Sequence, residues 1–297
     1  MPQVLKHIGL SLAVLLLGGL LAFRVPTGGG PVTTPADRSL ADSLLAALGA
    51  APGRTVPEMM LQAARSLVGT PYVGGTLEGE RETLRVFLTR TDCILFVETC
   101  LDLALTVSEC GPEAGFDDFA GRLARSRYRC APPWRYSDRR HYTTEWIRAA
   151  CARGELEDLT LPLGGKEYAH PIGFMSAHPD RYPALSRAAS DPVAAEDLRR
   201  IRGVEDSLNR TPCTCIPREA VPACLAGLRS GDIVCFVSSA EGLDISHVGF
   251  VLVENGRVGL LHASSSAGKV LVDPLPLSVY VARRKGIAGI KILRAAD

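Results

Sequence analysis

Neither sign of charge is in excess in this chain. The 297 residues include 33 lysines and arginines and 32 aspartates and glutamates, so the formal net charge is +1. No block of five or six like charges occurs, and there is no internal repeat. A protein that binds nucleic acid needs a basic surface to neutralise phosphates. The balance of charge therefore gives no reason to expect nucleic acid as a partner.

The sequence also lacks a hydrophobic run long enough to cross a membrane as a straight helix. Lys6 and His7 precede sixteen apolar or small residues, 8–23. At ~1.5 Å per residue a helix of this length covers about 24 Å, less than the ~30 Å hydrocarbon core of a bilayer. Residues 1–23 therefore favour a signal peptide, and an exported protein that is periplasmic or faces the periplasm from the inner membrane. Because no Ala-x-Ala cleavage site follows, an uncleaved membrane anchor is the alternative.

The nine cysteines lack the spacing of a zinc site. Cys213 and Cys215 are one residue apart, whereas common structural sites separate paired cysteines by two to four residues, and no histidine is near them in the sequence. We therefore expect no metal and no cofactor. In an exported protein one nucleophilic cysteine would leave eight, enough for up to four disulfides of unknown connectivity.

The expected helices come first and the expected strands last. Residues 24–36 are rich in Gly, Pro and Thr and predict a flexible linker, so that residues 37–297 form a single domain. Periodicity and capping signals predict helices at 39–48, 55–68, 93–107, 116–125, 143–153 and 194–208. Strands are predicted at 232–237, 246–253, 258–263, 270–272 and 289–293, and residues 82–88 fit either a strand or an extended segment. Helices segregated from a mostly antiparallel sheet make an α+β domain.

Asn255-Gly256 is the strongest local signal in the sequence. It separates two apolar runs, 246–253 and 258–263. Asn-Gly between such runs indicates a β-hairpin, because a type I′ turn needs positive φ at both central residues. Pairing across this turn places Glu254 opposite Arg257.

The same register brings two histidines together. It places Gly249 opposite His262, and His247 opposite Ser264. Because side chains alternate along a strand, His247 and His262 project from one face as diagonal neighbours, with Cβ atoms roughly 7–8 Å apart. Gly249 is expected to leave open space beside both rings. Such a pair suits a catalytic base and its orienting partner, and two strand histidines satisfied by local hydrogen bonds are the alternative.

Cys93 is predicted at the start of a buried helix. Asp92 suits the N-cap position, and the residues that follow to 107 are apolar nearly all round. A thiol in the first helical turn is near the positive end of the helix dipole and unpaired N–H groups, which lower its pKa and can stabilise an oxyanion. A buried structural cysteine is the alternative.

Cys93, His247 and His262, in this order, resemble the nucleophile, base and third polar residue of the NlpC/P60 superfamily of papain-like cysteine peptidases and amidases. Residues 69–75 look like the segment before its nucleophile, with Tyr72 at the position of its active-site tyrosine. Further segments resemble the N-acetylmuramoyl-L-alanine amidase-like family, formerly DUF1460; they are residues 141–146, 174–179, 242–249 and 261–265. These matches cover the chain from about residue 55 to its end.

Two features depart from the pattern of that family. Ile94 and Leu95 follow Cys93 where the family commonly has small hydroxyl residues, and Glu145 replaces an aspartate before the tryptophan. Neither change affects the three residues of the expected triad. Ile94 and Leu95 are expected to border the cleft, where they would affect specificity.

The resemblance implies a papain-like fold in which the N-terminus of the Cys93 helix packs against the sheet that carries the histidines. It implies that Cys93 attacks an amide, that His247 moves the proton, and that His262 orients His247. Tyr72 would donate to the oxyanion. Expected substrate contacts are an aromatic wall, in which Tyr142 and Trp146 share a helix face, together with His141, Ser246 and Ser264. A core stripe is the alternative for the aromatic residues.

The implied substrate is peptidoglycan or its soluble fragments, cut at the amide between N-acetylmuramic acid and L-alanine. Three alternatives stay open from the sequence. The first is a γ-D-glutamyl–diamino acid endopeptidase, the commoner activity in the superfamily. The second is a catalytically silent module that binds the cell wall at the membrane. The third is a papain-like lipid acyltransferase, although those enzymes place the histidine before the cysteine.

Overall fold

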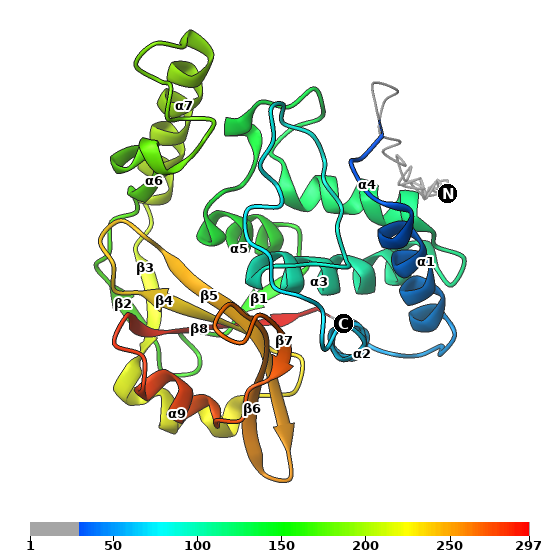
Figure 1. Cartoon of the computed structure of the whole chain (residues 1–297). Helices are drawn as coiled ribbons and strands as arrows, with labels where there is room; N and C mark the ends of the chain where they lie inside the picture. The colour runs from blue at the N-terminus through cyan, green and yellow to red at the C-terminus, as the bar shows by residue number, and fades with distance from the viewer. Residues whose placement is uncertain (1–29, 297) are drawn as a thin grey trace, which may run out of the picture.

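Helices and strands lie in separate layers of this protein (Figure 1). The computed structural model describes residues 30–296, so the expected signal peptide or anchor at residues 1–23 lies outside the described residues. The helices are α1 (Pro35–Gly49), α2 (Val56–Ser66), α3 (Cys93–Cys110), α4 (Phe116–Arg127), α5 (Thr143–Ala152), α6 (Phe174–Ala177), α7 (Pro192–Leu208), α8 (Val221–Cys224) and α9 (Leu277–Ala282). The strands are β1 (Leu156–Asp158), β2 (Lys166–Tyr168), β3 (Cys213–Pro217), β4 (Ile233–Ser238), β5 (Ile245–Glu254), β6 (Arg257–Ser264), β7 (Lys269–Val272) and β8 (Ile287–Ala295). The α+β prediction is confirmed.

The strands form one sheet in which the named strands pair antiparallel. Their order is β2-β3-β8-β4-β5-β6-β7, and β1 also pairs with β8. The last strand of the chain is therefore central, and the β5–β6 hairpin lies toward the β7 edge. None of the helices in residues 30–296 is long and apolar enough to cross a membrane.

Helix α3 covers one face of the sheet, with α1, α2, α4 and α5 around it (Figure 1). Every residue from Leu95 to Val107 is buried, as expected for a helix that is apolar nearly all round. Phe96 of α3 packs edge-to-face on Phe250 of β5, with ring centroids 5.5 Å apart. This contact fixes the first turns of α3 against the hairpin.

Helix α9 covers the opposite face. Its Tyr280 shares a hydrophobic cluster with Phe236 of β4 and Leu260 of β6, and the rings of Tyr280 and Phe236 have centroids 5.2 Å apart. Along β5, Val248 and Phe250 belong to the core under α3, whereas Val251 belongs to the cluster under α9. The alternation of side chains therefore assigns each hairpin residue to one of the two faces.

The predicted hairpin is confirmed. Asn255 and Gly256 have φ of 50° and 73°, the positive values that a type I′ turn requires, and Glu254 pairs with Arg257. Beyond the Phe250–Leu261 pair the direct β5–β6 ladder ends. The expected pairing of His247 with Ser264 is therefore not made, and the strands diverge where the histidine lies.

The linker prediction is wrong for its last residues. Pro35 is the first residue of α1, and Thr34 caps that helix. The N–H of Val32 donates to Leu84 O at 2.8 Å, and Val32 forms a bridge with Arg85. This bridge also answers the open question about residues 82–88, which are extended but belong to no named strand. Backbone hydrogen bonding over long sequence separations thus orders a segment whose composition suggests flexibility.

The structure also differs from the expectations for the cysteines. All nine are free thiols, so none of the up to four disulfides that eight cysteines would allow is present. Cys213 and Cys215 lie on β3, a strand that the sequence did not predict because its partners, β2 and β8, are distant in sequence. Within residues 30–296, no three His, Cys, Asp or Glu side chains are grouped so that they could hold a metal ion.

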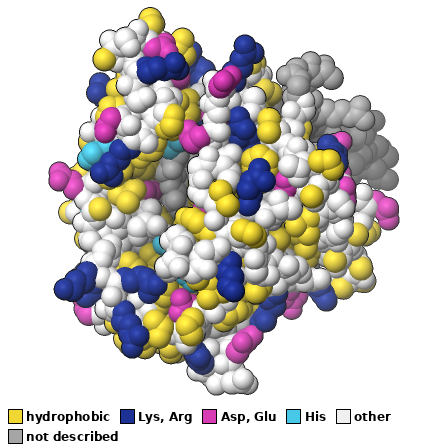
Figure 2. Space-filling view, viewed as in Figure 1, with side chains coloured by type: hydrophobic (Ala, Val, Ile, Leu, Met, Phe, Trp, Pro, Cys, Tyr) yellow, Lys and Arg dark blue, Asp and Glu magenta, His cyan; other side chains and the backbone are white. Residues whose placement is uncertain are grey.

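A lobe containing α6 and α7 projects from the top of the molecule in Figure 1. It has its own small hydrophobic cluster, which includes Tyr142, Met175 and Ile201. Figure 2, in the same view, shows acidic and basic side chains interspersed over this lobe and the neighbouring surface, with no single sign covering the whole face.

Candidate active site

Cys93 is the first residue of α3. The carboxylate of Asp92 caps the helix by accepting the N–H of Leu95 at 3.0 Å, as the sequence predicted. The half-buried thiol also interacts with the backbone N–H of Val248, the residue that follows His247. The structure therefore brings the sulfur beside the His247 segment, near the point where β5 and β6 diverge.

The electrostatics of the thiol differ from the prediction. Burial, and then the negative charge of Asp92, raise the pKa of Cys93 to about 12, although backbone N–H groups act in the opposite direction. The expected lowering by the helix N-terminus is therefore wrong, because loss of hydration outweighs the helix dipole here. The thiol of Cys93 is therefore protonated at neutral pH.

His247 and His262 form a hydrogen-bonded pair. His247 Nε2 lies 2.6 Å from His262 Nδ1, and the two rings are nearly perpendicular at 82°. Their projection from one face of the hairpin is confirmed. Burial, the neighbouring His262 and Arg284 lower the pKa of His247 to about 3, and burial also lowers the pKa of His262. Both imidazoles are therefore neutral, and His247 Nδ1 is not used in this contact.

Gly249 does not leave open space beside the rings. A Cβ atom at this position would lie 2.8 Å from Leu260 Cδ1 and 2.9 Å from both His262 Cβ and Leu261 O. The expectation of a vacant position is wrong, because the strands approach so closely that neighbouring atoms fill it. Glycine is required here for the approach of β6 to β5, which sets the position of His262.

Two residues of this site were missed by the sequence analysis. Asp273 Oδ2 lies 3.3 Å from His262 Nε2, although this ring nitrogen is not aligned for a hydrogen bond of good geometry. Tyr280 packs edge-on against His262, with centroids 5.5 Å apart. The available signal for Asp273 was register: it lies two residues after Leu271, which pairs with His262.

Tyr72 lies close to Cys93. It forms a backbone bridge with Thr91, and its N–H donates to Gly268 O at 2.9 Å. Burial, followed by the charges of Cys93 and Asp92, raises the pKa of Tyr72 to about 12. The phenol therefore keeps its proton at neutral pH and can act as a hydrogen-bond donor.

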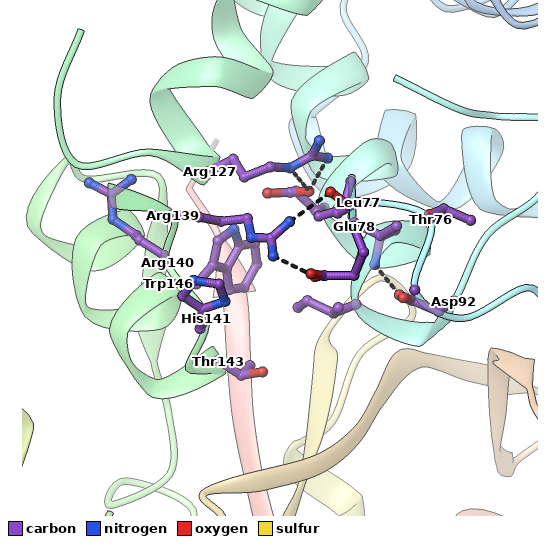
Figure 3. Close-up of a pocket in the computed structure, with 14 residues that line it drawn as sticks. Thr76, Leu77, Glu78, Asp92, Arg127, Arg139, Arg140, His141, Thr143 and Trp146 are labelled. Carbon is purple, nitrogen blue, oxygen red and sulfur yellow. Dashed lines mark hydrogen bonds and ion pairs between the residues drawn. The ribbon is translucent and has the colours of Figure 1, made fainter. Parts of the chain in front are cut away.

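A cavity of about 230 Å³ adjoins the start of α3. In Figure 3, Arg139 reaches across it to Glu78, an ion pair of 2.6 Å, and Arg127 pairs with Glu98 at the same distance. Further lining residues are Gly75, Thr76, Leu77, Asp92, Ile94, Leu95, Arg140, His141, Thr143 and Trp146. The cavity thus lies beside the residues that flank Cys93.

His141 and Trp146 line this cavity together, although their spacing did not require a common helix face. His141 is not in the helix: it precedes α5, and its Nε2 lies 2.8 Å from Tyr136 O. The indole N–H of Trp146 is buried without a hydrogen-bond partner among the described residues.

Tyr142 lies elsewhere, and the expected aromatic wall of Tyr142 and Trp146 is wrong. Tyr142 is the N-cap of α5 with an extended backbone, so the helical spacing of four does not apply to it. Its hydroxyl donates to Glu205 Oε1 at 2.7 Å and accepts the N–H of Met175 at 2.8 Å. Tyr142 therefore anchors the α6–α7 lobe.

The two serines proposed as substrate contacts bond to nearby groups of the sheet and its turn. Ser246 Oγ donates to Phe236 O at 3.3 Å, and a register shift in the β4–β5 pairing falls at this residue. Ser264 Oγ accepts the N–H of Ala267 at 3.2 Å and lies 3.1 Å from Ser266 Oγ. Neither serine lines the cavity beside α3.

A family comparison agrees with this geometry. The model of the AmiA-like family, described as N-acetylmuramoyl-L-alanine amidase-like, matches residues 62–287. The chain belongs to the N-acetylmuramoyl-L-alanine amidase-like family. The matched range includes α3, the β5–β6 hairpin and Asp273. No curated protein matches the sequence.

Solved structures give the same fold for this amidase-like chain. An N-acetylmuramoyl-L-alanine amidase from Bacteroides uniformis is 30% identical, with a TM-score of 0.73 over 82% of this chain and 99% of that one. A Bacteroides fragilis protein provisionally named a xylanase is 33% identical, with a TM-score of 0.69 over 78% and 99% of the two chains. A Legionella pneumophila protein assigned to DUF1460 has a TM-score of 0.64 at 22% identity over 88% and 95%, which shows the shared fold alone.

The positions that depart from the family pattern can now be located. Ile94 and Leu95 both line the cavity next to Cys93, so the wall is apolar there. Glu145 pairs with Arg129 on the outer side of the α5 start and does not line the cavity. The departures after Cys93 therefore border the cavity, as expected, and the departure at Glu145 concerns an ion pair.

Proposed function

We propose that this protein hydrolyses the amide between N-acetylmuramic acid and L-alanine in peptidoglycan fragments, with Cys93 as nucleophile. Membership of the amidase-like family supports a peptidoglycan amide as substrate. The observation that carries the cysteine mechanism is the hydrogen-bonded pair His247–His262, 2.6 Å apart, beside the segment that interacts with the Cys93 thiol. A papain-like (NlpC/P60) classification is part of this proposal.

The acylation half of the reaction starts from neutral groups. His247 Nδ1 accepts the thiol proton while Cys93 Sγ attacks the lactyl carbonyl carbon, so charge separates only as the C–S bond forms. The backbone N–H of Cys93 and the hydroxyl of Tyr72 donate to the oxygen that becomes negative. The C–N bond then breaks, and the imidazolium of His247 gives its proton to the departing alanine nitrogen. The product that remains is a thioester of the muramic acid.

The deacylation half reverses these roles. His247 accepts a proton from water as the water oxygen attacks the thioester carbonyl. The C–S bond breaks, and the sulfur leaves and recovers a proton from His247. The carboxylic acid of muramic acid is released and loses its proton to solvent, and the neutral thiol and imidazole are restored. One imidazole thus serves both halves, which requires His262 to hold its ring plane throughout.

The cavity beside α3 is the proposed subsite for the part of the substrate that carries no charge. Two of its carboxylates, Glu78 and Glu98, pair with Arg139 and Arg127. Asp92 accepts the N–H of Leu95, and Arg140 donates to the carbonyl oxygens of Arg125 and Ser126. A volume of about 230 Å³ is below the ~300–1,000 Å³ of pockets for drug-sized ligands, so it fits a single residue of the substrate. We assign it to the amino sugar, because a free carboxylate of the stem peptide would have to displace the carboxylates and backbone carbonyls that already bind these guanidinium groups.

We further propose that the protein works outside the cytoplasm, as residues 1–23 predict, and acts on soluble muropeptides. Such fragments reach a narrow cavity more readily than the polymer does. Attachment to the membrane through the N-terminal segment remains compatible with this proposal.

Mass spectrometry of the products from one defined disaccharide-tetrapeptide tests the proposed bond. The amidase releases a tetrapeptide that begins with L-alanine and leaves a disaccharide with a free lactyl carboxylate. A γ-D-glutamyl–diamino acid endopeptidase instead leaves L-alanyl-D-glutamate on the sugar, and that product would reject the proposed bond. A silent wall-binding module gives neither product from the wild-type protein, and would reject the enzyme altogether.

A further inference from the structure

Behind the histidine pair lies a buried carboxylate, that of Asp273, on the turn after β7. Its own N–H donates to Leu260 O at 2.7 Å, and its Oδ1 accepts the N–H of Leu275 at 2.9 Å. The first bond fixes the backbone and the second fixes the carboxylate, whose Oδ2 lies 3.3 Å from His262 Nε2 as an ion-pair contact. Asp273 is thus held by the backbone on one side and directed at the imidazole on the other.

The contacts from Asp273 to His262 and from His262 to His247 determine which ring nitrogens carry a hydrogen. A carboxylate can only accept, so His262 Nε2, which faces Oδ2, carries a hydrogen. In a neutral ring His262 Nδ1 is then bare and can only accept. The contact of 2.6 Å between His262 Nδ1 and His247 Nε2 needs one proton, which must therefore be on His247 Nε2. His247 Nδ1 is left bare, in the form that can accept a proton from a thiol.

We propose that Asp273 is a positioning residue that sets the tautomer of both histidines and thereby keeps His247 Nδ1 free to receive the proton of Cys93. This inference rests on the proposed cysteine mechanism and adds a fourth member to the expected triad. Asp273 does not touch the thiol or the substrate. It acts through His262, as the buried aspartate of a serine protease acts on its histidine, but with one more ring in between.

Other groups around the rings do not supply this function. Tyr280 presents its ring to His262 and stacks near His247 at 6.4 Å, and its contacts with both are aromatic. The guanidinium of Arg284 lies 3.3 Å above the Tyr280 ring and is a cation, which opposes protonation of either imidazole. Phe236 also stacks near His247, with ring centroids 5.5 Å apart, and packs against Tyr280. The carboxylate of Asp273 is the acceptor that these neighbours lack.

The variant Asp273→Asn tests the proposal. An asparagine amide can donate to His262 Nε2, which reverses both tautomers and places a hydrogen on His247 Nδ1. We expect kcat to fall about 10- to 100-fold with little change in KM. This loss is smaller than the loss expected when the residue that bonds directly to a catalytic histidine is altered. The matched control is Asp232→Asn, which removes another buried aspartate that binds a backbone N–H and pairs with Arg294 at 2.7 Å, at the start of β4 and away from the histidines. It should keep wild-type kcat.

Two further measurements separate positioning from a structural role. Long-range ¹H–¹⁵N spectra of protein with ¹⁵N-labelled histidine should show His247 and His262 as Nε2–H tautomers in the wild type, and a changed tautomer in Asp273→Asn. This readout needs no substrate, so it remains valid if the proposed amidase activity is wrong. In the variant His262→Asn, the amide oxygen of the new side chain can accept directly from His247 Nε2. Adding Asp273→Asn to this variant should cause no further loss of kcat.

The inference is overturned by any of three results. One is an Nδ1–H tautomer of His247 in the wild type. Another is unchanged kcat in Asp273→Asn with a folded protein. The third is an equal loss of kcat from Asp273→Asn in both His262 backgrounds, which would mean that the aspartate acts on stability or on another part of the site.

Discussion

The start and the middle of helix α3 differ in the polar groups that they bury. At its start, the Cys93 thiol and the histidine pair beyond Val248 are neutral at pH 7. In its middle, Asp102 lies 3.3 Å from the buried guanidinium of Arg122 on α4, which also pairs with Glu155 at 2.6 Å and with Glu109. Burial raises the pKa of Asp102 to about 7. The same hydrophobic helix therefore borders a site of neutral groups and a cluster of carboxyl groups around one buried guanidinium.

This contrast shows what burial does in each case. An ion held in the interior needs partners at fixed geometry, and losing one partner leaves an uncompensated charge. A neutral thiol or imidazole needs less, and burial shifts its pKa so that it stays neutral until a substrate arrives. The buried ion pairs stabilise the fold. Burial of the thiol and the imidazoles keeps these groups neutral, and it makes the thiol a weaker acid.

The largest expected effect distinguishes two cysteines of the same helix. Cys93→Ala should reduce kcat at least about 10⁴-fold, as removal of a nucleophile does in other hydrolases, with little change in stability. Cys100 lies on the same helix and is fully buried away from the hairpin histidines. Cys100→Ala should stay active in a steady-state assay. Equal activity of both variants would remove Cys93 from the mechanism.

The variant Arg122→Ala tests the buried cluster around the middle of α3. Asp102 would lose the cation with which it pairs, whereas Glu109 and Glu155 keep Arg125 and Arg153. We therefore expect the free energy of unfolding to fall by about 3–5 kcal/mol, measured by urea denaturation. Turnover by the protein that remains folded should be unchanged. Arg65→Ala, which breaks the exposed pair with Glu254, should cost only about 0–1 kcal/mol. Similar losses in both variants would show that burial does not increase the contribution of an ion pair to the free energy of unfolding.

Gly249→Ala connects stability and chemistry within the hairpin. The added methyl group meets Leu260, His262 and the Leu261 carbonyl at 2.8–2.9 Å, and we expect a loss of about 1–3 kcal/mol together with slower turnover. Gly259→Ala is the matched control in β6, because its added carbon meets Leu252 atoms only at 3.6–3.9 Å. Thermal unfolding and kcat of the two variants should differ clearly. If they do not, the tight approach does not position His262.

Tyr142→Phe tests whether the Tyr142 hydroxyl stabilises the α6–α7 lobe or contacts substrate in the cavity. Glu205 and the Met175 N–H lose a buried partner, so the free energy of unfolding should fall by about 1–3 kcal/mol. KM should not change, because Tyr142 does not line the cavity. A raised KM with unchanged stability would return Tyr142 to the substrate site.

The smallest effect concerns the pH dependence of the thiol. Because burial and Asp92 raise the pKa of Cys93 to about 12, the thiolate fraction should rise about tenfold per pH unit throughout pH 6 to 9. The rate of iodoacetamide alkylation, followed by mass spectrometry of the Cys93 peptide, should rise in proportion. A rate that is flat over this range would indicate a preformed thiolate–imidazolium pair instead.

Local sequence signals were sufficient for several parts of the fold and the site. The positive φ angles of Asn255-Gly256, the capping of α3 by Asp92 and the alternation of side chains along a strand depend on residues close together in the chain. They gave the hairpin, its register near the turn, the common face of His247 and His262, and the position of Cys93 at a helix start. Family resemblance supplied the chemical roles that these positions suggested.

Only the tertiary structure decided what surrounds those residues. The packing of β6 against β5 fills the space at Gly249, the turn after β7 brings Asp273 to His262, and the extended backbone at Tyr142 turns that side chain into another cluster. Burial against strands distant in sequence raises the pKa of Cys93, where the helix start alone suggested the reverse. Hydration and long-range contacts are properties of the assembled chain, whereas turns and caps are encoded within a few residues.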